Sequence, residues 1–282
     1  MQTLLFGSKG QLGADLIDVW NDDIQGFAHD ELDISDRDAV HGVISRERPG
    51  LVINAAAFTR VDECETNSAT AFEVNAEGAK NVADAAEAVG AAVMFISTDY
   101  VFDGEKGSPY AEDDVPAPLN VYGVSKLAGE HFVRQSNPRH YVVRTSSLFG
   151  VNARSNFVEA VIRKAQAGEP LRVVDDQISS PTFTHDLAMK LQELAATNAF
   201  GLYHITNSGS TSWYGLAAKV FELMGLEPSL TSITSEELAL PSRRPAFSVL
   251  ENRALAEAGL AELRPWEEAI AAYLQAKGQT PA

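Results

Sequence analysis

Short apolar runs alternate with helical patterns through the first half of this chain, and this alternation constrains its fold more than any other feature. Strands are expected at 2–6, 24–28, 51–53, 91–97 and 141–143, and helices at 11–20, 36–47, 69–89 and 118–135. Strands that are separated by helices pair in parallel, with the helices covering both faces of the sheet. The pattern therefore predicts an α/β protein with a doubly wound, Rossmann-type sheet.

The second half of the chain is less regular. Helices are expected at 155–167, 185–196, 212–224 and 265–276, and strands at 171–174 and 201–206. We expect a dinucleotide-binding domain made of 1–150 with segments of about 175–210, and a smaller, interleaved substrate-binding lobe made of about 151–174 and 211–282. The 282 residues are enough for this arrangement.

A glycine-rich segment follows the first expected strand at the N-terminus. It reads Gly7-Ser8-Lys9-Gly10-Gln11-Leu12-Gly13, so its glycines are spaced G-x-x-G-x-x-G. Such glycines allow a tight turn, close approach of a pyrophosphate and close helix–strand contact. The backbone N–H groups at Gln11 and Leu12 would then face the phosphates at the helix start. A plain turn is the alternative, but the position between strand and helix favours a dinucleotide site.

Two residues after the second expected strand bear on the choice of cofactor. An acidic residue about 20 positions past the glycines binds ribose hydroxyls and favours NAD, and Asp30 suits this role. His29 beside it suits the 2′-phosphate of NADP instead, so the choice between NADH and NADPH stays open. Asp33 and Ile34 are expected at the adenine edge, although Asp33 also suits a helix N-cap or a turn.

The third expected strand ends in small residues. Ala55, Ala56 and Ala57 precede Thr59, and small side chains at the carboxyl end of a strand let a cofactor lie against the backbone. We therefore add these four residues to the predicted cofactor site. Close helix packing is the alternative explanation for the alanines.

A Tyr-x-x-x-Lys sequence lies in the expected helix after the fourth strand. Tyr122 and Lys126 are four residues apart, so they share a helix face. An ammonium near a phenol lowers the pKa of the phenol, which would make Tyr122 an acid–base near neutral pH. Lys126 also suits the nicotinamide ribose, and Thr98 at the strand end suits a carbonyl oxygen. The pattern predicts a carbonyl reductase with Tyr122, Lys126 and Thr98 as catalytic residues.

The composition of the chain limits the kinds of partner that the protein is expected to bind. The net charge of −17 disfavours nucleic acid and anionic membranes as partners. No run approaches the length of a membrane helix and no leader precedes the first strand, so we expect a cytoplasmic protein. Cys64 is the only cysteine, and no spacing of Cys and His indicates zinc.

Together these motifs resemble the extended short-chain dehydrogenases/reductases, and more narrowly the dTDP-4-dehydrorhamnose reductases. The matching stretches, in order, are Gly7–Gly13, Asn54–Glu65, Ser97–Gly104, Tyr122–Glu130, Arg144–Gly150, Asn156–Phe157, Asp175–Gln177 through Pro181–Thr182, and Arg244–Ser248. The resemblance implies reduction of the 4-keto group of dTDP-4-dehydro-β-L-rhamnose to dTDP-L-rhamnose by NADPH or NADH. It also implies that Tyr122 donates the proton, while Thr98 and Asp99 lie at the substrate.

Three positions refine this resemblance. Related dehydratases carry Asp-Glu after the Thr, whereas Asp99-Tyr100 here suits a reductase that needs one proton donor. Many members have Trp where this chain has Ser147, next to the sugar, so the resemblance leaves the exact sugar open. Some members bind Mg²⁺ at a dimer interface through glutamates, and His185 and Asp186 near the matching place are no clear equivalent of those ligands. We therefore expect no metal site. We expect either a monomer or a homodimer.

A few further residues carry two interpretations each. Arg243 and Arg244 suit a pyrophosphate clamp or a solvated loop, with Arg244 counted at the substrate. Asn156 suits the substrate nucleotide or a helix N-cap, and Trp213 is interpreted as a core residue at a helix start.

Two functions of other classes compete with the reductase. One is a non-catalytic dinucleotide-binding subunit, like the regulatory subunit of methionine adenosyltransferase. The other is a sugar-nucleotide epimerase, which would consume no NAD(P)H.

Overall fold

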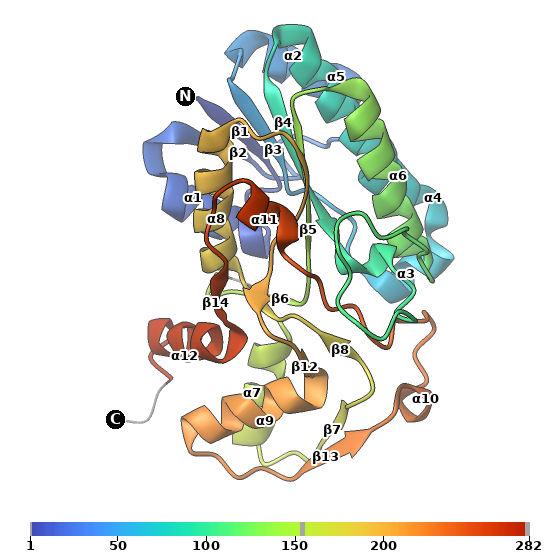
Figure 1. Cartoon of the computed structure of the whole chain (residues 1–282), viewed down its shortest axis with the longest axis vertical. Coiled ribbons are helices and arrows are strands. Elements are labelled where there is room, and N and C mark those ends of the chain that lie inside the picture. The colour runs from blue at the N-terminus through green and yellow to red at the C-terminus, as the bar shows by residue number, and fades with distance from the viewer. Residues whose placement is uncertain (1, 153–155, 280–282) are drawn as a thin grey trace.

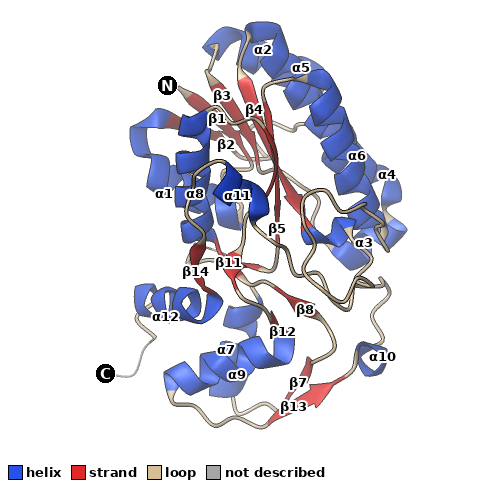
Figure 2. Cartoon of the chain, viewed as in Figure 1, coloured by secondary structure: helices blue, strands red, loops and turns tan. Residues whose placement is uncertain are grey.

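The computed structural model describes residues 2–152 and 156–279, and six parallel strands form its central sheet (Figures 1 and 2). In spatial order the strands are β2 (Ile24–Phe27), β1 (Thr3–Phe6), β3 (Leu51–Asn54), β4 (Ala92–Thr98), β5 (His140–Thr145) and β10 (Gly201–His204). All neighbouring pairs are parallel. The predicted fold class is confirmed.

Helices cover both faces of this sheet, which explains why its central strands are buried and mostly apolar. One face packs against α2 (Arg37–Glu47), α5 (Ala79–Val89) and α6 (Val121–Ser136). The other packs against α1 (Gln11–Trp20), α8 (Thr184–Thr197) and α11 (Arg253–Glu257). Every residue of β1 and β3 is buried, as expected for strands covered on two sides.

The order of the strands reverses at β1. The chain adds β2 on one side of β1 and then β3 on the other, so the connections diverge between β1 and β3. In open parallel sheets a crevice opens at such a point, outside the carboxyl ends of the strands, and ligands bind there. The glycine-rich segment follows β1 and the three alanines follow β3, so both predicted cofactor-binding segments lie at this crevice.

Two predicted helices have different bounds in the structure. The expected helix 69–89 is α4 (Ser68–Phe72), a π-helical turn (Glu73–Gly78) and α5. In that turn Asn75 hydrogen-bonds the backbone of Phe58 and the hydroxyl of Ser125, which ties it to the segment after β3. The expected helix 118–135 begins only at Val121, because the side chain of Asn120 caps it.

The remaining elements build a second, smaller core below the sheet in Figure 1. Its short strands are β6 (Leu148–Phe149), β7 (Leu171–Val174), β8 (Ile178–Ser179), β9 (Thr182–Phe183), β11 (Asn207–Ser208), β12 (Thr211–Ser212), β13 (Leu230–Ile233) and β14 (Leu263–Pro265). They pair as β7–β13, β8–β12, β6–β9 and β11–β14. Three helices pack together in this second core: α7 (Phe157–Gln166), α9 (Trp213–Met224) and α12 (Trp266–Ala276). Two short helices lie elsewhere. Helix α3 (Val61–Thr66) lies beside α6, and α10 (Ser235–Leu238) follows β13. The sequence patterns missed α3, α10 and α11 and, of the short strands in this core, all but β7.

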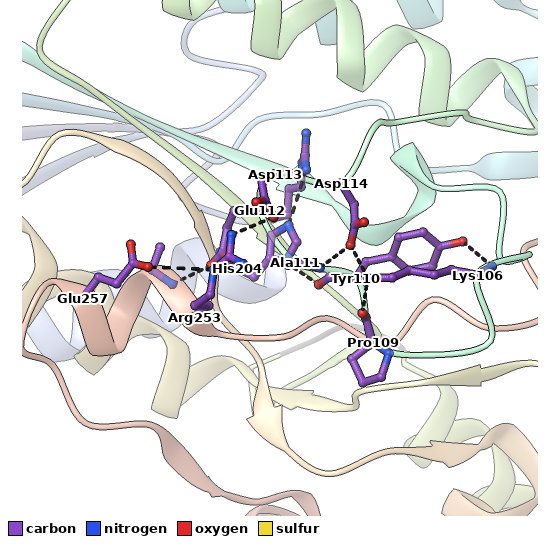
Figure 3. Close-up of polar contacts among 12 residues, drawn as sticks. Lys106, Pro109, Tyr110, Ala111, Glu112, Asp113, Asp114, His204, Arg253 and Glu257 are labelled. Atoms are coloured by element: carbon purple, nitrogen blue, oxygen red, sulfur yellow. Dashed lines mark hydrogen bonds and ion pairs between the residues drawn. The ribbon is translucent and has the colours of Figure 1, made fainter.

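The long segment between β4 and α6 is fixed against β10 and α11 (Figure 3). The Glu112 carboxylate accepts hydrogen bonds from the backbone N–H groups of His204 and Ala254, at 3.1 and 3.0 Å. The ring of His204 bonds the backbone carbonyl of Tyr110 at 3.0 Å. Because a carbonyl oxygen only accepts, Nδ1 of His204 carries the proton. Segments about 90 residues apart in sequence are thereby joined.

In the described part of the chain, no helix is both long enough and apolar enough to cross a membrane.

Candidate active site

Two connected cavities lie at the crevice between β1 and β3. The larger, of about 780 Å³, is bordered by Gly7, Gly10, His29, Asp30, Asp33, Ile34, Ala55, Ala56 and Ala57. Each of these residues was predicted to bind the cofactor. Phe58, Arg60, Thr70 and Glu73 also border it, although no pattern singled them out. We call this space the dinucleotide cavity.

The glycine turn has room for no side chain at two positions. A Cβ atom on Gly7, whose φ is +89°, would lie 2.7 Å from the backbone nitrogen of Ala56. A Cβ on Gly13 would lie 2.1 Å from the carbonyl oxygen of Gly7. No side chain caps α1, so the N–H groups of its first turn face the cavity without intrahelical partners. This geometry fits a pyrophosphate held by backbone N–H groups and the helix dipole.

The predicted ribose-binding position, which borders the same cavity, carries charges of both signs. Lys9 Nζ lies 2.9 Å from each carboxylate oxygen of Asp30, and the hydrogen bond from Lys9 holds the pKa of Asp30 below its ordinary value. Asp33 accepts hydrogen bonds from the backbone and hydroxyl of Ser35, so it is a turn residue. It is not the N-cap of α2, because Asp36 has that role.

The second cavity, of about 500 Å³, shares Gly10, Ala55 and Ala57 with the first. We call it the catalytic cavity. The predicted residues that border it are Gln11, Leu12, Gly13, Thr59, Thr98, Asp99, Tyr100, Tyr122, Lys126 and Ser147. They come together because parallel strands place their carboxyl ends at one edge of the sheet. The ends of β3, β4 and β5 and the first turns of α6 all reach this edge.

Tyr122 lies in the first turn of α6 with its ring against Tyr100. The two ring centroids are 5.9 Å apart and the planes meet edge to face, at 78°. Desolvation raises the pKa of the Tyr122 phenol, and a hydrogen bond with Thr98 opposes this only in part. The expectation that a neighbouring ammonium lowers this pKa is therefore wrong. The phenol is a protonated donor at neutral pH.

Lys126 explains why that lowering is missing. Its Nζ donates a hydrogen bond of 2.7 Å to the carbonyl oxygen of Ile96 and lies 4.0 Å from the centroid of the Phe95 ring. Burial lowers the pKa of Lys126 to about 7, although Glu130 opposes the shift. A lysine that is only partly charged near pH 7 exerts a weaker field on the phenol than a permanent cation would.

Asp99 is almost fully buried at the floor of the catalytic cavity. One carboxylate oxygen accepts from the Thr98 hydroxyl at 3.1 Å, and the other accepts from the Ser248 hydroxyl at 2.5 Å. Burial raises the pKa of Asp99 to about 6, and these hydrogen bonds limit the rise. Ser248 thus ties a distant segment of the chain to the catalytic strand.

Two predicted substrate residues border neither cavity. Arg244 forms a paired contact with Asp62, at 2.9 and 3.1 Å, and also donates to the carbonyl of Ser242. Asn156 accepts from the backbone N–H of Glu159 and is the N-cap of α7. The N-cap interpretation of Asn156 is confirmed. Arg243 is exposed, as the solvated-loop interpretation requires.

Ser147 lies at the rim of the catalytic cavity in a left-handed conformation, with φ of +46°. Its hydroxyl is 2.7 Å from that of Ser179. Thr145 and Ser146 at the end of β5 border the same cavity, and the Thr145 hydroxyl is buried without a partner. The position of Thr145 beside Thr98 in the sheet was the signal that could have identified it.

Comparison with known proteins decides the family. A family model described as the RmlD substrate binding domain matches residues 1–278. A dTDP-4-dehydrorhamnose reductase of Streptomyces griseus is 42% identical over 95% of this chain and 91% of its own length. This chain belongs to the dTDP-4-dehydrorhamnose reductase family.

Other relatives support this membership. The spore coat polysaccharide biosynthesis protein SpsK of Bacillus subtilis is 40% identical, over 97% of both chains. The crystal structure of the dTDP-4-dehydrorhamnose reductase of Bacillus anthracis, in complex with NADP, superposes with a TM-score of 0.95 at 37% identity, covering 98% of this chain and 100% of that one. The UDP-glucose 4-epimerase of Thermus thermophilus is only 20% identical, so its TM-score of 0.85 reflects a shared fold. Within the family, the nicotinamide cofactor and carbonyl reduction expected from the sequence are both supported.

Across residues 2–152 and 156–279, no three His, Cys, Asp or Glu side chains are arranged to hold a metal ion. The carboxylate of Asp186, considered from the sequence as a metal ligand, pairs with Arg264, at 2.6 and 2.8 Å, and accepts from Asn207. His185 stacks beside Phe183.

Proposed function

We propose that this protein reduces the 4-keto group of a dTDP-linked 6-deoxyhexose with NADPH or NADH, most directly dTDP-4-dehydro-β-L-rhamnose to dTDP-L-rhamnose. The observation that carries the proposal is the catalytic cavity, in which Tyr122, Thr98 and Lys126 meet beside the glycine turn. Family membership supplies the class of substrate.

Different residues of this chain have different roles in the proposed reaction. Gly7, Gly10 and Gly13 hold the pyrophosphate against backbone N–H groups, and Lys126 lies where it can hold the nicotinamide ribose. The bound nicotinamide supplies a hydride to the carbonyl carbon. Tyr122 donates its phenolic proton to the carbonyl oxygen, which prevents an alkoxide from accumulating. The Thr98 hydroxyl, which donates to Asp99 in the structure, would turn to donate its hydrogen bond to the same oxygen and position it.

Tyr122 holds its proton at neutral pH, as a proton donor must. Burial raises its pKa and makes the phenol a weaker acid, so the donation depends on the negative charge that develops on the substrate oxygen. Lys126 is only partly charged near pH 7, so its charged fraction gives the phenolate that is left a limited stabilisation. Asp99 and Tyr100 border the same cavity, so we assign them to the substrate with Ser147.

Both dinucleotides fit the ribose end of the cavity. Asp30 would accept hydrogen bonds from the ribose hydroxyls of NADH, whereas Lys9 supplies positive charge, and the His29 ring a hydrogen-bonding group, for the 2′-phosphate of NADPH. The crystal structure of the Bacillus anthracis relative contains NADP. We propose that the protein accepts both cofactors.

We also propose the following division of the chain. Residues 1–150 with about 175–210 bind the dinucleotide, and about 151–174 with 211–282 bind the sugar nucleotide. The position of β10 in the central sheet and of α8 against it supports this division. We propose that the protein acts in the cytoplasm as a monomer or homodimer. The free, buried thiol of Cys64 fits a reducing compartment.

The test is cofactor oxidation, followed by absorbance, over a panel of dTDP-, GDP- and UDP-linked 4-keto sugars with NADH and NADPH. The proposal expects turnover with the dTDP-linked 6-deoxy-4-keto sugar. Interconversion of sugars without cofactor consumption would show an epimerase. A stoichiometric protein partner with no turnover on any keto sugar would show a regulatory subunit.

A further inference from the structure

One aromatic residue from the second half of the chain reaches the catalytic cavity. Within the described part of the chain, every residue that borders this cavity lies in the first 148 positions except Trp213. Trp213 also borders a narrow cleft beside it, together with Tyr100, Gln177 and Pro245. The sequence suggested a core residue, but the indole is only partly buried and has one edge at the core and another at the cavity.

The structure fixes this ring in place. Trp213 is the first residue of α9, and the Ser212 hydroxyl before it caps the helix and donates to Asp175 at 2.5 Å. Strand β12 pairs with β8, which places Ser212 opposite Ile178. The indole packs against the Phe157 ring, with centroids 4.7 Å apart. A ring held by a helix cap, a strand pair and a second ring offers a rigid surface.

The chemistry of that surface differs from the rest of the cavity wall. The other two rings at the cavity, Tyr100 and Tyr122, are phenols that lie edge to face with each other. Ser147 adds only a small hydroxyl at the rim. Among the described residues that border the cavity, the indole of Trp213 is therefore the one aromatic ring without a hydroxyl.

The reaction fixes which part of the substrate lies near this face. The hexose carbonyl must come within hydrogen-bonding distance of the Tyr122 hydroxyl, so the pyranose ring occupies the catalytic cavity. A 6-deoxyhexose has a methyl group and a C–H-rich ring face, which pack well against an indole. We propose that Trp213 is a sugar-binding residue that packs against the apolar face of the 6-deoxy-4-ketohexose. This inference rests on the proposed function.

The test compares the affinities for dTDP and for dTDP-L-rhamnose, measured by calorimetry in the presence of the oxidised cofactor. Trp213→Ala should weaken binding of dTDP-L-rhamnose by about tenfold, which corresponds to 1.4 kcal/mol, and leave dTDP affinity nearly unchanged. Trp213→Phe keeps a ring and should fall between the two. The matched control is Tyr214→Ala, which removes the neighbouring ring on α9 that does not border the cavity.

Fluorescence gives a second readout that survives a poorly folding alanine variant. Of the three tryptophans, Trp20 and Trp266 are buried at 6% exposure. Saturating dTDP-L-rhamnose should change the emission of the parent protein much more than that of Trp213→Phe. The same change in both proteins would overturn the inference.

Three other outcomes also decide the question. Equal losses of dTDP and dTDP-L-rhamnose affinity in Trp213→Ala would place the indole at the nucleotide and contradict a role at the sugar. Unchanged affinity for both would leave the ring a purely structural role and overturn the inference. A parent protein that reduces and binds no dTDP-linked sugar would overturn the proposed function itself, whereas turnover without a Trp213 effect would overturn only this inference.

Discussion

Removing one partner of the buried ion pair behind the catalytic cavity should be among the most destabilising point mutations in this protein. The carboxylate of Glu130 on α6 accepts from Nε and Nη2 of Arg144 on β5, at 2.9 and 2.7 Å. The two side chains are 1% and 2% exposed, and Ser97 donates a further hydrogen bond of 2.5 Å to Glu130. His204 accepts from Arg144 at 3.4 Å on the other side.

Glu130→Gln keeps the size of the side chain and removes its charge, so the Arg144 guanidinium stays buried without a counter-ion. Breaking a buried pair from one side costs about 3–5 kcal/mol. The amide oxygen of Gln still accepts one hydrogen bond, so we expect about 3 kcal/mol. For a chain of this size that corresponds to a fall in Tm of about 6–12 °C.

The assay is denaturant unfolding of the protein without cofactor, with two comparison variants. Asp84→Asn breaks the exposed pair with Lys80 on α5 and should cost less than about 1 kcal/mol. The double variant Glu130→Leu with Arg144→Met removes both buried charges and should recover part of the loss. If Glu130→Gln unfolded within about 1 kcal/mol of the parent, as the exposed control does, the argument from desolvation would be refuted.

Three further predictions follow from the cavities. Gly13→Ala should weaken NADPH binding by at least about tenfold, because the new Cβ would overlap the carbonyl oxygen of Gly7. The control is Gly42→Ala, where the new Cβ has open space. Equal NADPH affinities of the two variants in a fluorescence titration would contradict the prediction. Burial lowers the pKa of Lys126 to about 7 in the folded protein, against an ordinary value of 10.5. Between these two pH values the unfolded chain holds the proton and the folded chain does not. The free energy of unfolding should therefore rise with pH more in the parent than in Lys126→Met. Parallel urea-unfolding curves for the two proteins across this range would argue against a buried amine. Ser248→Ala removes the hydroxyl that donates a hydrogen bond to the ionised carboxylate of Asp99, so the pKa of Asp99 should rise above about 6. An NMR titration of the carboxyl group measures this pKa, and an unchanged value would contradict a hydrogen bond between Ser248 and Asp99.

Local patterns were sufficient to predict the sheet and most of the two cavities. The turn from Gly7 to Gly13 and the pair Tyr122 and Lys126 depend on spacing within one or two helical turns, and such spacing is visible in a sequence. Parallel pairing then brings the ends of β1, β3 and β4 to one edge, so their residues meet without further information.

Contacts between distant segments were not predictable in this way. Arg244 meets Asp62 across 182 positions, and Ser248 meets Asp99 across 149, so neither pair leaves a periodic signal. Trp213 reaches the cavity only because β12 pairs with β8. The expected effect of Lys126 on the Tyr122 pKa also failed, because helical spacing fixes a shared face but not the backbone carbonyl that the amine bonds.

The central claim is that the Tyr122 phenol delivers the proton to a substrate carbonyl. The most direct measurement is kcat of Tyr122→Phe with NADPH and dTDP-4-dehydro-β-L-rhamnose, alongside the NADPH affinity of the same variant. We predict a fall in kcat of at least about a hundredfold with nearly unchanged cofactor affinity, because only the donor is lost. A variant that keeps the full rate would contradict the account.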